Sequence, residues 1–423
     1  MSLVWLQVGQ CGNQVGQEWW RILSCNASDE GSSYPYFSRG GSVNAICVDS
    51  EAKVIRTMRR QLKKSSFRDS SLIAGRTGRG NNWAYGYSGS GATAERNLLD
   101  QTMESLRKEV ERQDCYSGTV LLHSLCGGTG SGLGARLCEE IRQTYPAGHI
   151  LSVAVAPHQS GETPLQHYNS LLCLAWLQRF ADGVLIFQND DVMCQAAALT
   201  DKKSPAVSGT PTAVSLSAMN SHIASCLAGL LYPVYSLKTS SSVSVGPEPW
   251  ELLRSLCPMS SLKFLHTAQV CQRGTAFWDR VTSSLVQTLP RASPEGRMHH
   301  SLSVLAAARC SQDDSFLVSR DSVLNKLKQA YRCVAWNPRP VHCWIDSQNI
   351  VDPTCHSLSL TVCANHSSAA DLISRVSQRA QAMYTARAYL HWYQRYGCED
   401  EDFELAFQTL DEVVEEYSRL GDP

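Results

Sequence analysis

Apolar and polar positions follow two different periods along the first half of the chain. Continuous apolar runs, which indicate strands, lie at residues 3–8, 43–49, 118–125, 149–156 and 183–188. Apolar positions at helical spacing follow the first four runs, at residues 14–23, 51–62, 134–143 and 165–178. Strands that alternate with helices predict βαβ units, and therefore an α/β fold with a mostly parallel sheet covered on both faces.

A further amphipathic helix is predicted just before the third run. Its apolar positions are Ala94, Leu98, Leu99, Met103, Leu106 and Val110. They recur every three to five residues with charged residues between them, which is the helical period.

The second half of the chain is less regular. A polar connector at 201–213 precedes a long helical pattern at 212–232, and a Ser-rich break follows it. Strand-like runs lie at 301–310 and 356–364, and the chain ends in two predicted helices, at 385–397 and 399–420. The predicted divisions are an α/β domain (1–211), a central helix (212–232), a smaller α+β domain (233–380) and C-terminal helices (381–423).

Composition narrows the class of partner. Hydrophobic residues make up 43% and charged residues 18% of the 423 residues, which is typical of globular chains. The net charge of −1 argues against nucleic acid or an anionic membrane as the main partner. The start has no signal-peptide pattern and no apolar run approaches the ~20 residues that span a bilayer, so a cytoplasmic location is expected.

Seventeen cysteines are scattered along the chain without a CxxC pair. With no export signal, we interpret them as reduced thiols that serve mainly as small apolar core residues.

The candidate for chemistry is "CGGTGSG", the glycine loop, residues 126–132, directly after the strand at 118–125. Its backbone N–H groups, and the positive end of a helix that is expected to begin near Ser131, suit a phosphate. The same glycines also fit a tight turn that binds nothing. No lysine occurs between Lys108 and Lys202, which excludes the Walker P-loop here.

A dinucleotide site is the alternative. "GSGLGA" (130–135) fits the GxGxxA pattern after a strand. The acidic residue expected at the end of the next strand is missing, since no acid precedes Glu162 there. A soluble NAD-dependent enzyme therefore stays open as a second function.

Several motifs together resemble the tubulins. In chain order they are "VGQCGNQVG" (8–16), "RGNNWAYGY" (79–87), "GGTGSG" (127–132), "QHYNSLL" (166–172) and "YTARAYLHWYQRYGCEDEDF" (384–403). The resemblance implies a GTP-binding domain with a mostly parallel sheet, a central helix, a smaller α+β domain and a C-terminal helical hairpin. Within the family the motifs are similar to those of the delta- and zeta-tubulins. The short segment between Cys11 and Asp49 favours zeta.

The resemblance also implies roles for residues that match the motifs. Asp49 and Glu51 would face Mg²⁺ through water, although alone they would fit a helix N-terminal cap. Glu162 would hold the ribose and Asn220 the guanine edge. The other nucleotide-binding candidates, for GTP or GDP, are Gln10, Cys11, Asn81, Ser124, Cys126, Gly127, Gly128, Thr129, Gly130 and Ser131. Without the resemblance, Asn81 would be taken as a turn-capping residue.

Other positions depart from the family pattern and leave nucleotide affinity and base preference open: Leu199, Leu216, Gln166 and Cys126. Tubulins hydrolyse GTP with an acid delivered by the next subunit, and Glu251 is the candidate for that role. Whether this chain hydrolyses GTP is left open.

The expected function is that of a GTP-binding structural protein of the cytoskeleton. Centrioles and basal bodies of ciliated cells are the context that the resemblance to delta- and zeta-tubulins implies. The expected partners are other tubulins, centriolar proteins or a second copy of the chain, joined end to end in a nucleotide-dependent manner.

Overall fold

We describe a computed structural model of the chain. It describes residues 2–26, 36–38, 41–61, 67–89, 93–161, 163–201, 214–232, 249–273, 277–310, 315–346, 348–352 and 357–421. The chain forms two compact units: unit 1 is Met1–His222 with Ile373–Glu412, and unit 2 is Ile223–Leu372 with Val413–Pro423. The four-part division drawn from the sequence is finer than this grouping and stays a prediction.

Unit 1 is built on a parallel sheet. Its strand order is β3-β2-β1-β4-β5-β6, and each neighbouring pair runs parallel. The bounds are β1 Ser2–Val8, β2 Ala45–Asp49, β3 Leu72–Ala74, β4 Tyr116–Ser124, β5 His149–Ala156 and β6 Gly183–Gln188. Every residue of β2 is buried, as expected for a strand covered on both faces. The predicted α/β class is confirmed.

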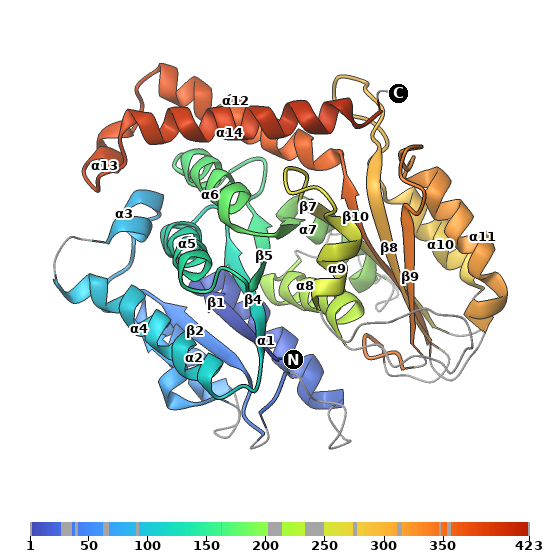
Figure 1. The fold of residues 1–423 in the computed structure, drawn as a ribbon, viewed down its shortest axis with the longest axis horizontal. Helices are drawn as coiled ribbons and strands as arrows, with labels where there is room; N and C mark the ends of the chain where they lie inside the picture. Colours follow the sequence, from blue (N-terminus) through green and yellow to red (C-terminus); the bar gives the residue numbers. More distant parts are fainter. Residues whose placement is uncertain are drawn as a thin grey trace. The chain divides into compact units, whose positions relative to one another are not determined.

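Helices connect these strands in the predicted alternation, which can be followed in Figure 1 from blue to green. They are α1 Gly9–Asn26, α2 Ala52–Gln61, α3 Trp83–Ser88, α4 Thr93–Glu111, α5 Gly134–Thr144, α6 Gln166–Phe180 and α7 Asn189–Asp201. The long helix α8, Leu216–Leu231, follows at the predicted central position. Because these strands run parallel, their carboxyl ends, with the loops that follow them, lie along one edge of the sheet.

Unit 2 has a mixed sheet. The strand order is β7-β10-β8-β9, in which β10 is antiparallel to both neighbours and β8 and β9 are parallel. The bounds are β7 Phe264–Arg273, β8 Ser301–Cys310, β9 Val341–Asp346 and β10 Ser357–His366, with helices α9 Pro249–Leu256, α10 Trp278–Gln287 and α11 Ser315–Ala330. The sequence predicted β8 and β10 but missed β7 and β9, because "FLHTAQVCQR" and "VHCWID" mix polar and apolar residues.

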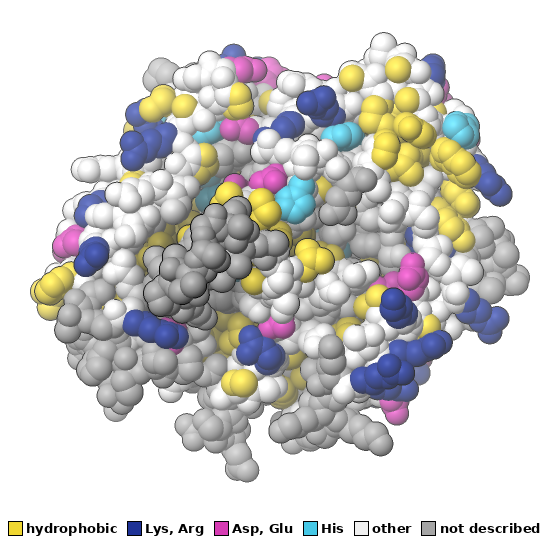
Figure 2. Space-filling view, turned by 180° about the vertical axis from the view of Figure 1, so that it is seen from behind, with side chains coloured by type: hydrophobic (Ala, Val, Ile, Leu, Met, Phe, Trp, Pro, Cys, Tyr) yellow, Lys and Arg dark blue, Asp and Glu magenta, His cyan; other side chains and the backbone are white. Residues whose placement is uncertain are grey.

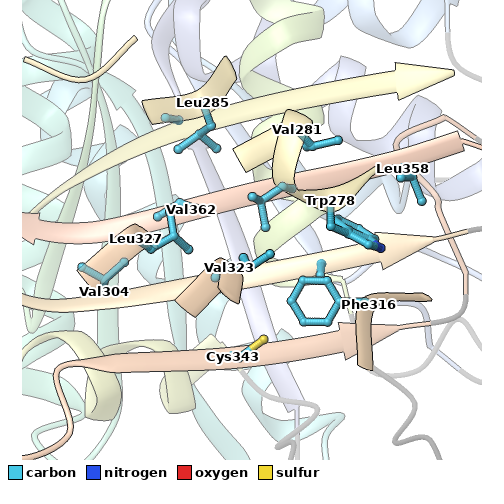
Figure 3. Packing of buried hydrophobic residues seen from close by; sticks show 14 of the residues in the cluster. Trp278, Val281, Leu285, Val304, Phe316, Val323, Leu327, Cys343, Leu358 and Val362 are labelled. Atoms are coloured by element: carbon cyan, nitrogen blue, oxygen red, sulfur yellow. The ribbon is translucent and has the colours of Figure 1, made fainter. Parts of the chain in front are cut away.

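The core of unit 2 lies between α10, α11 and the sheet. Figure 3 shows Val281, Leu285, Val323 and Leu327 from the helices gathered against residues of the strands. Trp278 and Phe316 meet edge to face with ring centroids 4.7 Å apart.

The C-terminal region has two long helices, α12 Ser368–Thr385 and α14 Asp400–Ser418, with the short α13 Leu390–Gln394 between them. The predicted helix over 385–397 is wrong in length. Arg387 and Tyr389 have φ values of 53° and 61°, so the left-handed backbone interrupts the helix before Leu390. Among the described helices none is long and apolar enough to cross a membrane.

Candidate functional site

The glycine loop joins β4 to α5 through a wide helical turn. The backbone from Gly128 to Leu133 forms a single π-helical turn, and α5 continues from Gly134. The Ser131 hydroxyl donates a hydrogen bond to the carbonyl of Gly127. Helical geometry therefore begins at Gly128, three residues before the predicted start. Turns of this type often occur at functional sites.

Packing explains some glycines of the loop and not others. A Cβ at Gly132 would collide with the carbonyl of Trp83, and a Cβ at Gly128 would lie 2.7 Å from the carbonyl of Arg79. At Gly127 a Cβ would meet only the Ser124 hydroxyl, at 3.7 Å. The tight-turn alternative accounts for Gly128 and Gly132, whereas it leaves Gly127 without a steric reason. A ligand that approaches the backbone would supply one.

The start of α1 lies against the glycine loop. Gly9 has a φ of 74°, and a Cβ there would lie 3.0 Å from the amide nitrogen of Gly130. The Asn13 amide donates to the carbonyls of Gly9, at 2.9 Å, and Val48, at 3.0 Å. The first turn of α1, with the exposed Gln10 and the half-buried Cys11, is thereby held beside the glycine loop.

The Cys11 and Cys126 thiols belong to the same site. Burial raises the pKa of the Cys11 thiol to about 12, and a negative charge on Cys126 would raise that pKa further. Neither cysteine takes part in a disulfide bond within the part of the chain that the structure describes. The Cys126 sulfur lies 3.8 Å from the Ser124 hydroxyl oxygen. Compared with a glycine, the Cys126 side chain adds bulk at the start of the glycine loop.

Asp49 supplies a buried carboxylate at the end of β2. Only 3% of its surface is exposed. Its Oδ1 accepts a hydrogen bond from the Glu51 amide at 2.9 Å, whereas Oδ2 has no hydrogen-bond partner among the described residues. Burial raises the pKa of Asp49 to about 6, although the bond from the Glu51 amide opposes the shift. A helix N-terminal cap thus accounts for Oδ1 of Asp49, whereas it leaves Oδ2 unexplained.

Ser50 connects this carboxylate strand to the glycine loop. The Ser50 and Thr129 hydroxyl oxygens are 2.6 Å apart and share a hydrogen bond. Glu51 is exposed at the start of α2. Among the described residues there is no group of three His, Cys, Asp or Glu side chains that could hold a metal ion. The donors present fit Mg²⁺ bound by one or two carboxylates, water and phosphate oxygens, which is its usual coordination beside nucleotides.

The loop Gly80–Asn82, which we call the GNN loop, has left-handed backbone at Gly80 and Asn81, with φ values of 55° and 51°. The Asn81 side chain is exposed. Asn82, not Asn81, caps α3, because its Oδ1 accepts the Tyr85 amide at 3.1 Å. The turn-capping alternative considered for Asn81 therefore belongs to its neighbour.

Asn169 is the residue that sequence reasoning missed. It is completely buried near the start of α6, and its amide donates to the carbonyls of Asn81 and Cys126, both at 2.7 Å. It ties the GNN loop to the glycine loop. Its only signal in the sequence is its place in "QHYNSLL".

The remaining candidates are placed as follows. Glu162 lies outside the described residues, and so does the side chain of Leu199. Asn220 is half-buried on α8 in unit 1, next to Ser221, which donates to Glu18 of α1 at 3.0 Å. Leu216 is 65% exposed and Gln166 is buried. Glu251 lies in the first turn of α9 in unit 2, with its carboxylate 3.3 Å from Arg254.

Comparisons with known proteins add to this geometry. Residues 2–196 match the Tubulin/FtsZ family, GTPase domain. The chain is 28% identical over 467 residues to the tubulin delta chain of Homo sapiens and to that of Macaca fascicularis, covering 99% of this chain and all of each relative. It is also 28% identical over 450 residues to the tubulin beta chain of Schizophyllum commune, covering 100% of this chain and 96% of the relative.

These similarities span nearly the full length, so they include both units. They do not favour the NAD-dependent enzyme that "GSGLGA" left open, because the same loop falls inside the matched GTPase domain. The preference for zeta over delta is untested and stays a prediction.

Proposed function

Because the chain is a divergent member of the tubulin family that carries its GTPase domain in residues 2–196, we propose that it is a structural protein of the cytoskeleton. It binds GTP or GDP between the start of α1, the GNN loop and the glycine loop. Bound nucleotide stabilises the fold and an end-on contact with the next subunit. Binding and assembly are then coupled, because each stabilises the same state.

The observation that supports the proposal most is the buried carboxylate of Asp49 at the end of β2, where the next residue, Ser50, is hydrogen-bonded to the glycine loop. The buried Oδ2 lacks a hydrogen-bond partner among the described residues, and Ser50 ties this strand end to Thr129. A buried carboxyl group in such a place is stable either when it is protonated or when a cation neutralises its charge. Mg²⁺ would supply the positive charge that neutralises the phosphates, a role that lysine fills in P-loop proteins.

The chain's own groups have separate roles in this proposal. Backbone N–H groups of Gly127 to Ser131, at the start of a helical turn, face the phosphates. The Thr129 and Ser124 hydroxyls and the Asn81 amide donate to phosphate oxygens. Glu162 holds the ribose and Asn220 the guanine edge, while Gln10 and Cys11 lie beneath the nucleotide. Asp49 and Glu51 face Mg²⁺ through water.

Hydrolysis is proposed to need a second subunit. Glu251 would activate a water in the neighbour's site, so the carboxylate works in trans. Its position in the first turn of α9 and its ion pair with the exposed Arg254 support a side chain that is held at a surface.

The partners are proposed to be proteins: another tubulin, a centriolar or basal-body protein, or a second copy of this chain. The net charge of −1 supports a protein partner over nucleic acid. Among the described residues of the face shown in Figure 2, both Lys or Arg and Asp or Glu side chains are present. The similarity to proteins named tubulin delta chain supports a cytoplasmic location at centrioles or basal bodies.

The test is to denature the purified protein and identify the nucleotide that it releases by mass spectrometry. Stoichiometric GDP or GTP is expected. Release of NAD would reject the proposal and restore the dinucleotide enzyme. Protein that carries no nucleotide and takes up no GTP would reject both.

A further inference from the structure

The side chain of Asn169 uses its full hydrogen-bonding capacity. Its Nδ2 donates to the carbonyls of Asn81 and Cys126, both at 2.7 Å. Its Oδ1 accepts the amide of Trp83 at 2.8 Å and the hydroxyl of Tyr393 at 2.7 Å. An asparagine side chain has two donors and two lone pairs, so all four are occupied. A flipped amide would turn its oxygen toward two carbonyls, so only one orientation fits.

These four partners come from segments that are distant in the sequence. Asn81 and Trp83 lie at the GNN loop and the start of α3, Cys126 opens the glycine loop, and Tyr393 lies on α13. Tyr393 is itself buried. Asn81 is among the residues that we assign to the phosphates, and the Cys126 carbonyl belongs to the peptide that carries the N–H of Gly127, which we also assign to them. One buried amide therefore joins both phosphate-facing loops and supports them from α13.

The direction of these bonds matters for the ligand. A trans peptide unit is planar, so its C=O and N–H groups point in opposite directions. The carbonyl of Cys126 points at Asn169, which turns the N–H of Gly127 away from Asn169. This N–H belongs to the glycine that chain packing does not explain. A donor at the entrance of the glycine loop is thus aimed by a side chain that need not touch the nucleotide.

We propose that Asn169 is a positioning residue of the phosphate site, which acts by fixing the peptide after Cys126 and the spacing between the glycine and GNN loops. The inference rests on the proposed binding of GTP and goes beyond it by naming the residue that aligns the phosphate donors. It predicts that a change at Asn169 reduces affinity according to the number of phosphates on the nucleotide.

Unit 2 offers a matched control. Asn365 is also completely buried, and its Nδ2 donates to the carbonyls of Leu256 at 2.9 Å and Leu262 at 2.7 Å. Its Oδ1 accepts the hydroxyl of Tyr417 at 2.8 Å. The chemistry is almost the same as at Asn169, but none of the three partners is a predicted nucleotide residue. Asn365→Asp thus measures the structural cost of the same change.

The experiment compares Asn169→Asp with Asn365→Asp in the full chain. A carboxylate cannot donate to two carbonyls, so the peptide after Cys126 should rotate. We expect affinity for GTP and GDP to fall about 10- to 100-fold in Asn169→Asp, and affinity for GMP, measured by competition, less than about threefold. Asn365→Asp should lower the melting temperature while all three affinities stay within about threefold of wild type.

Equal losses for GTP and GMP, or no loss, in Asn169→Asp would overturn the positioning role. If Asn169→Asp does not fold, Tyr393→Phe takes its place, because it removes a single hydrogen bond to Asn169. In Tyr393→Phe we expect affinity for GTP and GDP to fall about two- to fivefold, and affinity for GMP to fall less. An equal effect on all three nucleotides in Tyr393→Phe would also overturn it. Wild-type protein that binds no guanine nucleotide rejects the proposed function itself, which is a separate result.

Discussion

Asp49 shows how a single side chain can indicate a ligand. Its buried carboxylate receives one hydrogen bond, from the Glu51 amide, while Oδ2 lacks a partner among the described residues. Burial raises the pKa of Asp49 from 3.8 to about 6. The folded state therefore binds a proton more tightly than the unfolded state, so without a cation this group destabilises the fold as the pH rises from about 4 to above 6. A bound cation would stabilise the ionised carboxylate and remove this destabilisation of the fold.

Asp49→Asn tests this interpretation. The amide carries no charge, so the nucleotide-free protein should become more stable at pH 7.5 by about 1–2 kcal/mol in urea denaturation. GTP affinity of the wild type should fall at least about tenfold when EDTA removes Mg²⁺, and that of the variant should change little. A variant as dependent on Mg²⁺ as the wild type would refute the metal role of Asp49.

The glycine loop and α3 form one packed element. A Cβ at Gly86 would collide with the carbonyl of Gly128, and a Cβ at Gly132 would collide with that of Trp83. The backbones meet directly, so α3 can carry the GNN loop into a fixed place beside the glycine loop. This backbone contact, together with Asn169, sets the shape of the site.

Gly132→Ala and Gly127→Ala should therefore behave differently. Overpacking at Gly132 should lower stability by about 3 kcal/mol or more, since the Cβ would meet the Trp83 backbone, which cannot rotate away. Gly127→Ala should change stability by less than about 1 kcal/mol, because its Cβ has room and its φ of −85° suits alanine. Gly127→Ala should instead weaken GTP binding. Similar melting temperatures for the two variants would contradict the packing argument.

Stability of the whole protein should depend on buried neutral histidines. Burial lowers the pKa of His123 and of His222 from 6.5 to about 4, and it lowers the pKa of His366 well below 6.5. His123 is held by the Ser152 hydroxyl, at 2.8 Å from Nε2. Below pH 6.5 the unfolded chain binds protons that the folded chain does not, so stability is fully present above 6.5 and is lost as the pH falls.

Urea denaturation at pH 7.5, 6.0 and 5.0 measures this loss. Each such histidine contributes a slope of up to about 1.4 kcal/mol per pH unit below 6.5. His123→Gln should reduce the total slope by up to that amount. A His123→Gln slope equal to that of the wild type would rule out His123 as a source of acid sensitivity.

Assembly can be tested through Glu251. If this carboxylate completes the site of a neighbouring subunit, GTP hydrolysis should rise with protein concentration, and Glu251→Ala should abolish that rise while GTP binding is kept. Hydrolysis that is absent in the wild type, or independent of concentration, argues against a role in trans.

The sequence by itself determined the α/β class, the strands of unit 1 except the three-residue β3, and the glycine loop, because burial on both faces leaves apolar runs and close backbone approaches demand glycine. Its motifs, which follow one another in a fixed order, also indicated the resemblance to the tubulins. Only the tertiary structure decided that Asn82 caps α3, that Asn169 joins two loops, and that one oxygen of Asp49 lacks a partner among the described residues. Hydrogen bonds between distant segments, such as those from Asn169 to Asn81, Cys126 and Tyr393, leave no period in the sequence. They exist only where the fold brings the segments together.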